Sequence, residues 1–312
     1  LSGASGAEIA AELASILDME YVALESRRFP DGEAYVRVPP ESIESVRSER
    51  VVLVSNTFPD SGIMQTILLL GAISDVRKGD LSSLKGDWNG DTSDVGPGIF
   101  LAIPYYGYAR QDKRFGFGES ISAKVVADVL SEYCDGIAIL DLHAPEVLDG
   151  MEIDIEFVSS MPEIAESLQR EVSPDFILSP DKGAISRASE VAGIIGCEFS
   201  YLEKTRIDAH TIEHTPKDLE VSGKVVAIVD DMISTGGTIC RASDALRRQG
   251  ATEVHAACTH GLFTGGALTR LANHVDGIFT TDSLPNPRAN VSAAPALARG
   301  LSMMMSEGSH KG

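Results

Sequence analysis

Cysteine is scarce in this sequence and long hydrophobic runs are missing, and each shortage excludes a class of protein. The four cysteines lie far apart and form no Cys-X-X-Cys pair. This spacing is typical of reduced thiols in an intracellular protein and argues against a disulfide framework. No apolar stretch approaches the length of a membrane span. The sequence therefore predicts a cytoplasmic protein with no membrane partner.

Basic residues are the second shortage. The chain has 26 Lys and Arg against 46 Asp and Glu, which gives a formal net charge of −20. Nucleic-acid binding needs a basic face, so we expect no nucleic-acid partner. A chain this acidic can handle phosphates only if it concentrates its few cations locally or recruits Mg²⁺.

The chain is long enough for two domains, since 43% of its 312 residues are hydrophobic. Helix and strand patterns alternate along it, which predicts an α/β fold with doubly wound parallel sheets. The pattern that begins at Val51 resembles the one that begins at Val225, at an offset of 225 − 51 = 174 residues. We interpret this as a duplicated unit and expect two similar domains, 1–149 and 150–312, with Ala144–Gly150 between them.

Two segments break the alternation. Lys78–Gly98 holds five glycines, four aspartates and the only Trp, so it is predicted to be a surface insertion. Lys204–Glu220 is polar and predicts no helix or strand. Near the start, a strand over Tyr21–Leu24 and a turn at Pro30-Asp31-Gly32 followed by Ala34–Val38 predict a hairpin.

The clearest candidate site follows the apolar strand pattern Val225–Val229. Asp230 and Asp231 stand where this strand is expected to end, and Ser234-Thr235-Gly236-Gly237-Thr238 precedes a predicted helix from Ile239. Ligands of open α/β sheets bind at the carboxyl ends of the strands. Glycines let the backbone approach an anion, and the first N–H groups of a helix point at it. We expect a ligand with a phosphate and a diol or metal, such as a sugar phosphate; a capped helix without a ligand is the alternative.

A second loop follows the strand pattern Ile99–Ile103 and concentrates three basic residues. Arg110 can bind a phosphate through two parallel N–H groups, and Lys113 and Arg114 add positive potential. Several aromatic residues accompany them. This composition at a strand end favours a nucleotide-phosphate site over a solvated charged loop.

Two weaker patterns complete the set. His143 ends one strand pattern, and Asp181 stands at what we take to be the equivalent strand end of the other half. Because Mg²⁺ usually takes only one or two protein ligands, both are candidate Mg²⁺ or nucleotide contacts, although His is an unusual ligand for so hard a cation. Lys204 and Arg206 alternate on an extended segment, where two cations can lie along a polyphosphate if the loop closes over the site. An ordinary surface loop is the alternative.

Six motifs occur in the order found in the ribose-phosphate diphosphokinase (phosphoribosyl diphosphate synthetase) family, which the chain resembles over nearly its whole length. They are Phe29-Pro30-Asp31-Gly32-Glu33, Tyr108-Ala109-Arg110-Gln111-Asp112, Asp141-Leu142-His143, Ser179-Pro180-Asp181-Lys182-Gly183, Lys204-Thr205-Arg206 and Val229 through Thr238. The Ser-Thr-Gly-Gly-Thr and Asp-Lys-Gly-Ala wordings resemble the archaeal branch. The resemblance implies two domains of type I phosphoribosyltransferase-like fold.

The resemblance also implies an activity. The diphosphoryl group of ATP would pass to O1 of ribose 5-phosphate, with Mg²⁺, giving AMP and 5-phosphoribosyl 1-diphosphate for nucleotide biosynthesis. The enzyme would be a homo-oligomer whose ATP site is shared between subunits. The implied ATP-binding residues are Phe29, Asp31, Gly32, Glu33, Arg110 and Gln111. The implied metal ligands are His143 and Asp181, and the catalytic residues are Lys204 and Arg206. The implied ribose 5-phosphate contacts are Arg206, Asp230, Asp231, Ser234, Thr235, Gly236, Gly237 and Thr238.

Two rival functions remain to be compared with this one. A phosphoribosyltransferase that consumes the diphosphate would share the loop after Val229 but lack the ATP set of Phe29, Arg110 and His143. A noncatalytic regulatory relative would keep the fold and lose catalytic side chains, whereas Lys204 and Arg206 are both present. The sequence therefore favours the synthetase over both.

Overall fold

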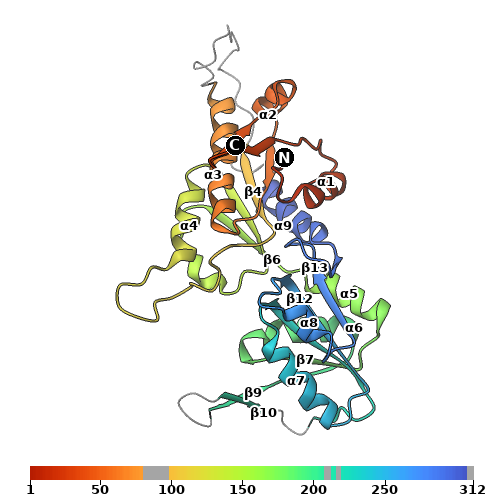
Figure 1. Ribbon diagram of the computed structural model, residues 1–312. Helices are drawn as coiled ribbons and strands as arrows, with labels where there is room; N and C mark the ends of the chain where they lie inside the picture. Colours follow the sequence, from red (N-terminus) through yellow and green to blue (C-terminus); the bar gives the residue numbers. More distant parts are fainter. Residues whose placement is uncertain (80–97, 207–211, 216–218, 308–312) are drawn as a thin grey trace. The chain divides into compact units, whose positions relative to one another are not determined.

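The computed structural model describes residues 1–79, 98–206, 212–215 and 219–307, so the expected insertion lies almost wholly outside the described residues. The chain divides into two compact units (Figure 1). Unit 1 comprises Leu1–Val158 and Ala294–Gly312, and unit 2 comprises Ser159–Ala293. Each unit has its own parallel sheet, which confirms the expected α/β class.

Unit 1 contains a four-stranded parallel sheet of order β3-β4-β5-β6. Its strands are β3 (Val51–Val54), β4 (Ile99–Ile103), β5 (Gly136–Leu140) and β6 (Asp154–Val158). Its helices are α1 (Ala7–Ile16), α2 (Ile43–Ser48), α3 (Asp60–Lys78), α4 (Ser122–Ser131) and α9 (Ala294–Glu307), with short 3₁₀ helices at Pro40–Ser42 and Pro145–Leu148. A separate hairpin pairs β1 (Glu25–Arg28) with β2 (Ala34–Arg37) around the expected Pro-Asp-Gly turn.

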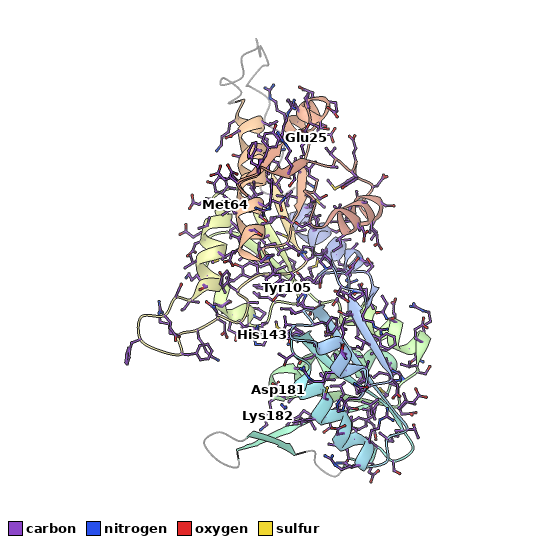
Figure 2. The ribbon with its side chains drawn as sticks, viewed as in Figure 1. Glu25, Met64, Tyr105, His143, Asp181 and Lys182 are labelled. Carbon is purple, nitrogen blue, oxygen red and sulfur yellow. The ribbon has the colours of Figure 1, made fainter. Side chains whose placement is uncertain are left out.

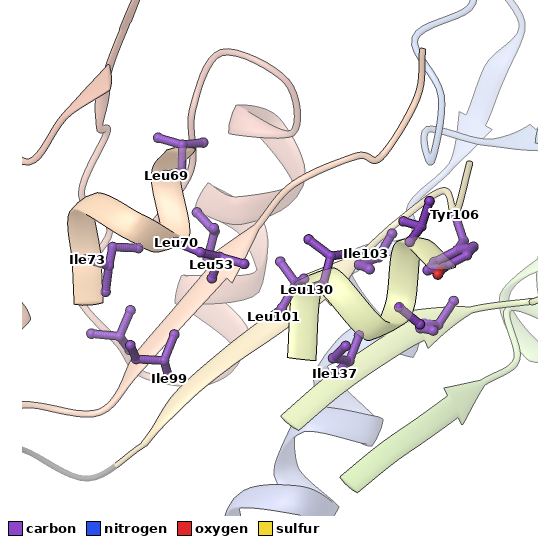
Figure 3. Packing of buried hydrophobic residues seen from close by; sticks show 14 of the residues in the cluster. Leu53, Leu69, Leu70, Ile73, Ile99, Leu101, Ile103, Tyr106, Leu130 and Ile137 are labelled. Carbon is purple, nitrogen blue, oxygen red and sulfur yellow. The ribbon is translucent and has the colours of Figure 1, made fainter. Parts of the chain in front are cut away.

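The core of unit 1 lies between the sheet and the helices α3 and α4. Leu53 and Leu101 on neighbouring strands pack in one cluster with Leu70 of α3 and Leu130 of α4 (Figure 3). All four side chains are fully buried. Strands that are apolar on both faces in this way are typical of parallel sheets that are covered by helices.

Unit 2 contains a six-stranded parallel sheet of order β14-β13-β12-β11-β7-β8. Its strands are β7 (Phe176–Ser179), β8 (Glu198–Tyr201), β11 (Val225–Ile233), β12 (Glu253–Gly261), β13 (Gly277–Thr281) and β14 (Ala289–Val291). Its helices are α5 (Met161–Glu171), α6 (Ile185–Ile195), α7 (Gly237–Arg248) and α8 (Ala267–Leu271), with a 3₁₀ turn at Lys182–Ala184. On β11, Val226 and Ile228 belong to the cluster that includes α7, whereas Ala227 and Val229 belong to the cluster of α5 and α6.

The two units share a topology. Ser2 forms single parallel bridges to Ala23 on one side and to Val54 of β3 on the other. The order Ala23, Ser2, β3, β4, β5, β6 therefore matches the order β8, β7, β11, β12, β13, β14 of unit 2. Strands β3 and β11 occupy the same place in their sheets, which supports the duplication inferred from the repeated pattern.

The crossings between units do not coincide with the expected boundary after residue 149. The chain crosses after Val158 and again after Ala293. Strand β6 completes the sheet of unit 1, so Ala144–Gly150 lies inside that unit. Helix α9 also belongs to unit 1, where it packs so closely on β6 that a Cβ atom on Gly300 would stand 2.2 Å from a methyl carbon of Val158.

Three local expectations were wrong. Lys204–Glu220 was expected to form no element, but β9 (Glu203–Arg206) and β10 (Ile212–Thr215) pair as an antiparallel hairpin. Tyr21–Leu24 was expected to be a strand, but only Ala23 forms a bridge there and β1 begins at Glu25. Strand β11 runs on to Ile233 instead of ending before the acidic pair. For β11 the reason is its pairing with β12, which extends to Ile233 and is not contained in the local pattern.

The close approach at Gly107 yields a stability prediction. A Cβ atom there would lie 2.1 Å from the carbonyl oxygen of Thr57, so Gly107→Ala must displace backbone. We expect it to lower the free energy of unfolding by about 1–3 kcal/mol or more. Gly71→Ala is the matched control, because no atom lies within 4 Å of its added Cβ. Within helix α3 that change is expected to stabilise by about 0.8–1.0 kcal/mol. Urea unfolding measures both, and equal stability of the two variants would contradict the packing described.

Candidate functional site

The loop between β11 and α7 carries the strongest candidate site. Strand β11 ends at Ile233, and Gly236 adopts a left-handed backbone conformation with φ of 73° directly before the helix. None of the five backbone N–H groups from Ser234 to Thr238 donates to another group of the described chain. Unpaired N–H groups at the start of a helix attract anions. We call Ser234–Thr238 the phosphate loop.

A second segment, Gly261–Gly266, begins at the last residue of β12 and holds the phosphate loop in place. The N–H groups of Leu262 and Phe263 both donate to the carbonyl of Ile233 at 3.1 Å, and Thr264 N–H donates to the carbonyl of Ser234 at 3.0 Å. Because a trans peptide points its N–H and C=O in opposite directions, the N–H groups of Ser234 and Thr235 face away from this second loop. We call Gly261–Gly266 the supporting loop.

Sequence reasoning missed the supporting loop, although it had a usable signal. Gly261, Gly265 and Gly266 follow a strand pattern, as the glycines of the phosphate loop do. Gly265 and Gly266 both have positive φ angles, 59° and 74°. At Gly261 a Cβ atom would clash with the Phe263 ring at 2.4 Å. A glycine-rich stretch at the end of the neighbouring strand therefore marks a second wall of the same site.

The acidic pair precedes the phosphate loop on β11. Asp230 accepts a hydrogen bond from the N–H of Asp231 at 2.9 Å. Asp231 is buried, with 4% of its side chain exposed, and lies 3.8 Å from the guanidinium of Arg187 on α6. Burial raises the pKa of the Asp230 carboxyl well above its usual value of 3.8, and the charges of Asp231 and Asp181 raise it further. This end of the sheet concentrates negative charge that a cation or a hydroxyl-bearing ligand can stabilise.

Asp181 follows β7, the strand beside β11. One of its carboxylate oxygens accepts N–H bonds from Gly183 at 2.8 Å and from Ala184 at 3.3 Å. The parallel register Leu178↔Ile228 carries Asp181 to the level of Asp231 across the strand pair. The structure therefore brings Asp181, Asp230 and Asp231 together in unit 2, as their positions at strand ends predict.

Residues of the expected ATP set lie in unit 1. Phe29 is 39% exposed beside the hairpin turn and forms an edge-to-face contact with Tyr35 at 5.8 Å between ring centroids. Arg27 lies over the same Phe29 ring at 5.2 Å. In the turn, Asp31 accepts from the N–H of Glu33 at 3.0 Å, and Gly32 has a φ of 95°. The hairpin thus presents an aromatic ring and two carboxylates on a rigid turn.

The basic loop after β4 is exposed. Arg110 and Gln111 are both exposed, and the side-chain carbonyl of Gln111 accepts from the Ser122 hydroxyl at 2.6 Å. Further along, Glu119 closes the loop by accepting the N–H groups of Phe115 and Gly116 at 2.6 and 2.9 Å. Arg110 itself lies in a turn that is closed by the bond from the N–H of Gln111 to the carbonyl of Tyr108 at 2.8 Å, and its side chain is exposed.

The two candidate metal ligands lie in different units and follow different strands. His143 is exposed after β5, whereas Asp181 follows β7 (Figure 2). In the shared topology β5 corresponds to β13, so the expectation that His143 and Asp181 occupy equivalent strand ends was wrong. No group of three or more His, Cys, Asp or Glu side chains suited to a metal occurs among the described residues.

Lys204 and Arg206 lie on β9, and the structure describes only their backbone. Lys204 pairs with His214 and Arg206 with Ile212 in the antiparallel register of β9 and β10. The expected segment thus has extended backbone, as the alternating cations require. Their catalytic roles stay predictions.

The carboxylate cluster predicts an effect of Asp230→Asn on stability. Because the folded chain binds this proton more tightly than the unfolded chain, stability falls as pH rises from 3.8 through the raised pKa. We expect the variant, without Mg²⁺, to be more stable than wild type at neutral pH by on the order of 1–2 kcal/mol. The difference should vanish under acidic conditions. Urea unfolding against pH measures it, with the exposed Asp128→Asn as control for net charge. A destabilised Asp230→Asn at neutral pH would contradict the electrostatics described.

Comparison with families of known proteins agrees with the two-unit division. The phosphoribosyl transferase domain family matches residues 152–292, nearly all of unit 2. The family described as the N-terminal domain of ribose phosphate pyrophosphokinase matches residues 97–133 in unit 1. Each match covers one part of the chain. Both families are the ones that the order of the sequence motifs predicts.

Whole-chain relatives extend the match to both units. A ribose-phosphate pyrophosphokinase of Methanopyrus kandleri is 39% identical over 302 residues, 96% of this chain and 96% of that protein. One from Pyrococcus furiosus is 36% identical over 88% of this chain and 90% of its own length. The crystal structure of phosphoribosylpyrophosphate synthetase from Mycobacterium smegmatis matches with a TM-score of 0.78 and 28% identity, covering 98% of each chain. The chain belongs to the ribose-phosphate pyrophosphokinase family.

Proposed function

We propose that this chain transfers the diphosphoryl group of ATP to O1 of ribose 5-phosphate, giving 5-phosphoribosyl 1-diphosphate and AMP for nucleotide biosynthesis. The observation that carries the proposal is the phosphate loop, whose five unpaired N–H groups follow an acidic pair at the end of β11. Relatives that share nearly the whole chain carry the name of this activity.

The sugar phosphate occupies the end of β11. Its phosphate lies in the phosphate loop, where N–H groups and the start of α7 supply positive potential. Asp230 and Asp231 stand just before this loop, where carboxylates accept hydrogen bonds from the ribose hydroxyls. O1 attacks the β-phosphorus of ATP and loses its proton, and the bond from that phosphorus to the AMP oxygen breaks.

ATP is bound by the residues of unit 1. The Phe29 ring stacks on adenine and is supplied by a neighbouring subunit, with Asp31, Gly32 and Glu33 at the same turn; the exposed ring on a rigid hairpin supports this role. Arg110 and Gln111 contact the nucleotide from their exposed loop. The assembly is therefore a homo-oligomer with a shared ATP site.

Mg²⁺ fits the donors that the chain offers. Asp181 presents a carboxylate already oriented by two N–H bonds, and oxygen is the donor that Mg²⁺ prefers. His143 is exposed after β5 and is the candidate Mg²⁺ contact of unit 1. A set of one or two protein ligands is usual for this ion, since phosphates and water supply the rest. When bound, the ion would neutralise charge on the phosphate oxygens.

Lys204 and Arg206 provide the remaining positive charge. Negative charge builds on the transferred diphosphoryl group, so positioning and positive charge account for most of the catalysis. Both residues lie on the β9–β10 hairpin, a short antiparallel ribbon outside the main sheet. Closure of this ribbon over the substrates would exclude water.

We place the reaction in the cytoplasm, where ATP and reduced thiols are available. The four cysteines are unpaired thiols, which suits a reducing compartment. Among the described residues, no helix combines the length and the apolar character needed to cross a bilayer.

The activity is tested directly by product formation. Purified protein with ATP, ribose 5-phosphate and Mg²⁺ is expected to yield AMP and 5-phosphoribosyl 1-diphosphate in equal amounts. Lys204→Ala is expected to lower kcat by orders of magnitude, because it removes charge that acts on the transferred group. The exposed Lys124→Ala is the matched control and should keep wild-type kcat.

Two outcomes of this assay would exclude the proposal or part of it. Full activity in Lys204→Ala would contradict the catalytic role of the β9–β10 hairpin. Absence of AMP with the wild-type chain, together with binding to another enzyme, would favour a noncatalytic regulatory protein. Release of diphosphate from 5-phosphoribosyl 1-diphosphate in the presence of a base would favour a phosphoribosyltransferase.

Phe29 offers a separate test of the ATP site. Stacking of a base on an aromatic ring is worth about 1–3 kcal/mol. Phe29→Ala is therefore expected to raise KM for ATP about tenfold or more while KM for ribose 5-phosphate stays unchanged. Phe199→Ala is the control, because Phe199 is similarly exposed, 43% against 39%, and lies on β8. A steady-state analysis with each substrate varied measures both constants, and equal KM values for ATP in the two variants would reject the adenine contact.

A further inference from the structure

The side chain of Arg270 connects the phosphate loop with the supporting loop. It lies on α8, directly after the supporting loop. Its guanidinium donates to the carbonyl of Thr235 in the phosphate loop. It also donates to the carbonyl of Gly265 in the supporting loop at 3.2 Å. One side chain thus links the ends of strands β11 and β12.

With the bond to Thr235, three consecutive carbonyls, those of Ile233, Ser234 and Thr235, accept hydrogen bonds. The carbonyls of Ile233 and Ser234 are held by backbone N–H groups of the supporting loop. The next carbonyl, that of Thr235, is held by the Arg270 side chain instead. Since each engaged carbonyl turns the following N–H the other way, Arg270 sets the direction of the Gly236 N–H as the supporting loop sets the two before it.

The peptide between Thr235 and Gly236 is the one that most needs such a contact. Gly236 has no side chain and a φ of 73°, a conformation from which glycine departs easily. A Cβ atom there would lie 3.1 Å from Leu271, so α8 also packs against this residue. Backbone hydrogen bonds hold the earlier peptides, whereas this one depends on Arg270.

We propose that Arg270 is a positioning residue that holds the Thr235–Gly236 peptide with its N–H directed at the phosphate of ribose 5-phosphate. It acts through the backbone and contacts the carbonyls of two loops. The inference rests on the proposed function of the phosphate loop. Loss of Arg270 then weakens binding of the sugar phosphate and leaves binding of ATP unchanged.

Two variants separate positioning from charge. Arg270→Gln removes both the charge and the paired N–H donors. Arg270→Lys keeps the charge but replaces the planar fork by a single ammonium, which cannot hold two carbonyls in the same geometry. Arg248→Gln is the matched control, because Arg248 is exposed at the opposite end of α7 and its loss changes the net charge equally.

Steady-state kinetics with each substrate varied, and calorimetry of ribose 5-phosphate binding without ATP, test the proposal. A hydrogen bond to a charged group accounts for about a ten- to hundredfold change in binding. We expect KM and Kd for ribose 5-phosphate to rise by about this factor in Arg270→Gln and Arg270→Lys. KM for ATP and the midpoint of thermal unfolding should stay at wild-type values, as should all constants of Arg248→Gln.

Three results would overturn the inference. The first is an unchanged Kd for ribose 5-phosphate in Arg270→Gln. The second is a wild-type Kd in Arg270→Lys, which would leave charge as the only effect. The third is an equal loss of affinity for ribose 5-phosphate and ATP. Failure of the proposed function is distinguishable, because the wild-type chain would then form no AMP. Even then, calorimetry would measure the Kd for ribose 5-phosphate of Arg270→Gln and of the wild-type chain, and the difference would decide the role of Arg270.

Discussion

The candidate site depends on one constraint, which is that the backbone carbonyls at the end of β11 point toward the supporting loop. Parallel pairing with β12 continues past the strand as bonds from the supporting loop to Ile233 and Ser234. A carbonyl that is held on one side forces the next N–H to the other side. The anion site is therefore a property of the strand pair, and the glycines only make room for it.

Under the proposed function, this arrangement lets a chain with a net charge of −20 bind a phosphate. The phosphate loop supplies N–H dipoles, which carry no net charge and need no nearby lysine. Asp181, Asp230 and Asp231 lie at the same end of the sheet and attract cations or hydroxyl groups instead. Burial and repulsion by Asp231 and Asp181 raise the pKa of Asp230, so its negative charge is unfavourable there unless a cation or hydroxyl groups stabilise it. The carboxylates and the N–H groups of the phosphate loop can therefore lie next to each other and bind different parts of one ligand.

Much of this was predictable from sequence, and the remainder was not for identifiable reasons. The strands of unit 2 and the loop Ser234–Thr238 follow from apolar runs bounded by glycine, which depend on local chemistry. The length of β11 depends on its pairing with β12, which lies elsewhere in the chain, so the local pattern does not contain it. The hairpin β9–β10 pairs two nearby polar segments outside the main sheet, and such segments lack the apolar alternation that predicts a strand. The expected domain boundary after residue 149 differs from the observed division because α9, at the end of the chain, returns to unit 1 through contacts with β5 and β6. Arg270 was missed because its partners are carbonyl groups, which every residue has.

The duplicated topology shows why only one half has a phosphate loop. In unit 1 the loop after β3 meets the loop after β4, as the phosphate loop meets the supporting loop. There side chains make two of the contacts, in addition to a backbone bond from the N–H of Thr57 to the carbonyl of Tyr105 at 3.3 Å: Asn56 accepts the N–H of Tyr105 at 2.7 Å, and Thr57 Oγ1 accepts the N–H of Gly107 at 2.8 Å.

The first turn of the following helix α3 also carries an acidic residue, Asp60, which disfavours an anion. Polar side chains that bond the neighbouring loop make a structural joint, whereas glycines and small hydroxyl residues leave the N–H groups open. The same fold therefore yields a structural joint in one unit and the proposed binding site in the other, and the difference lies in a few side chains after one strand.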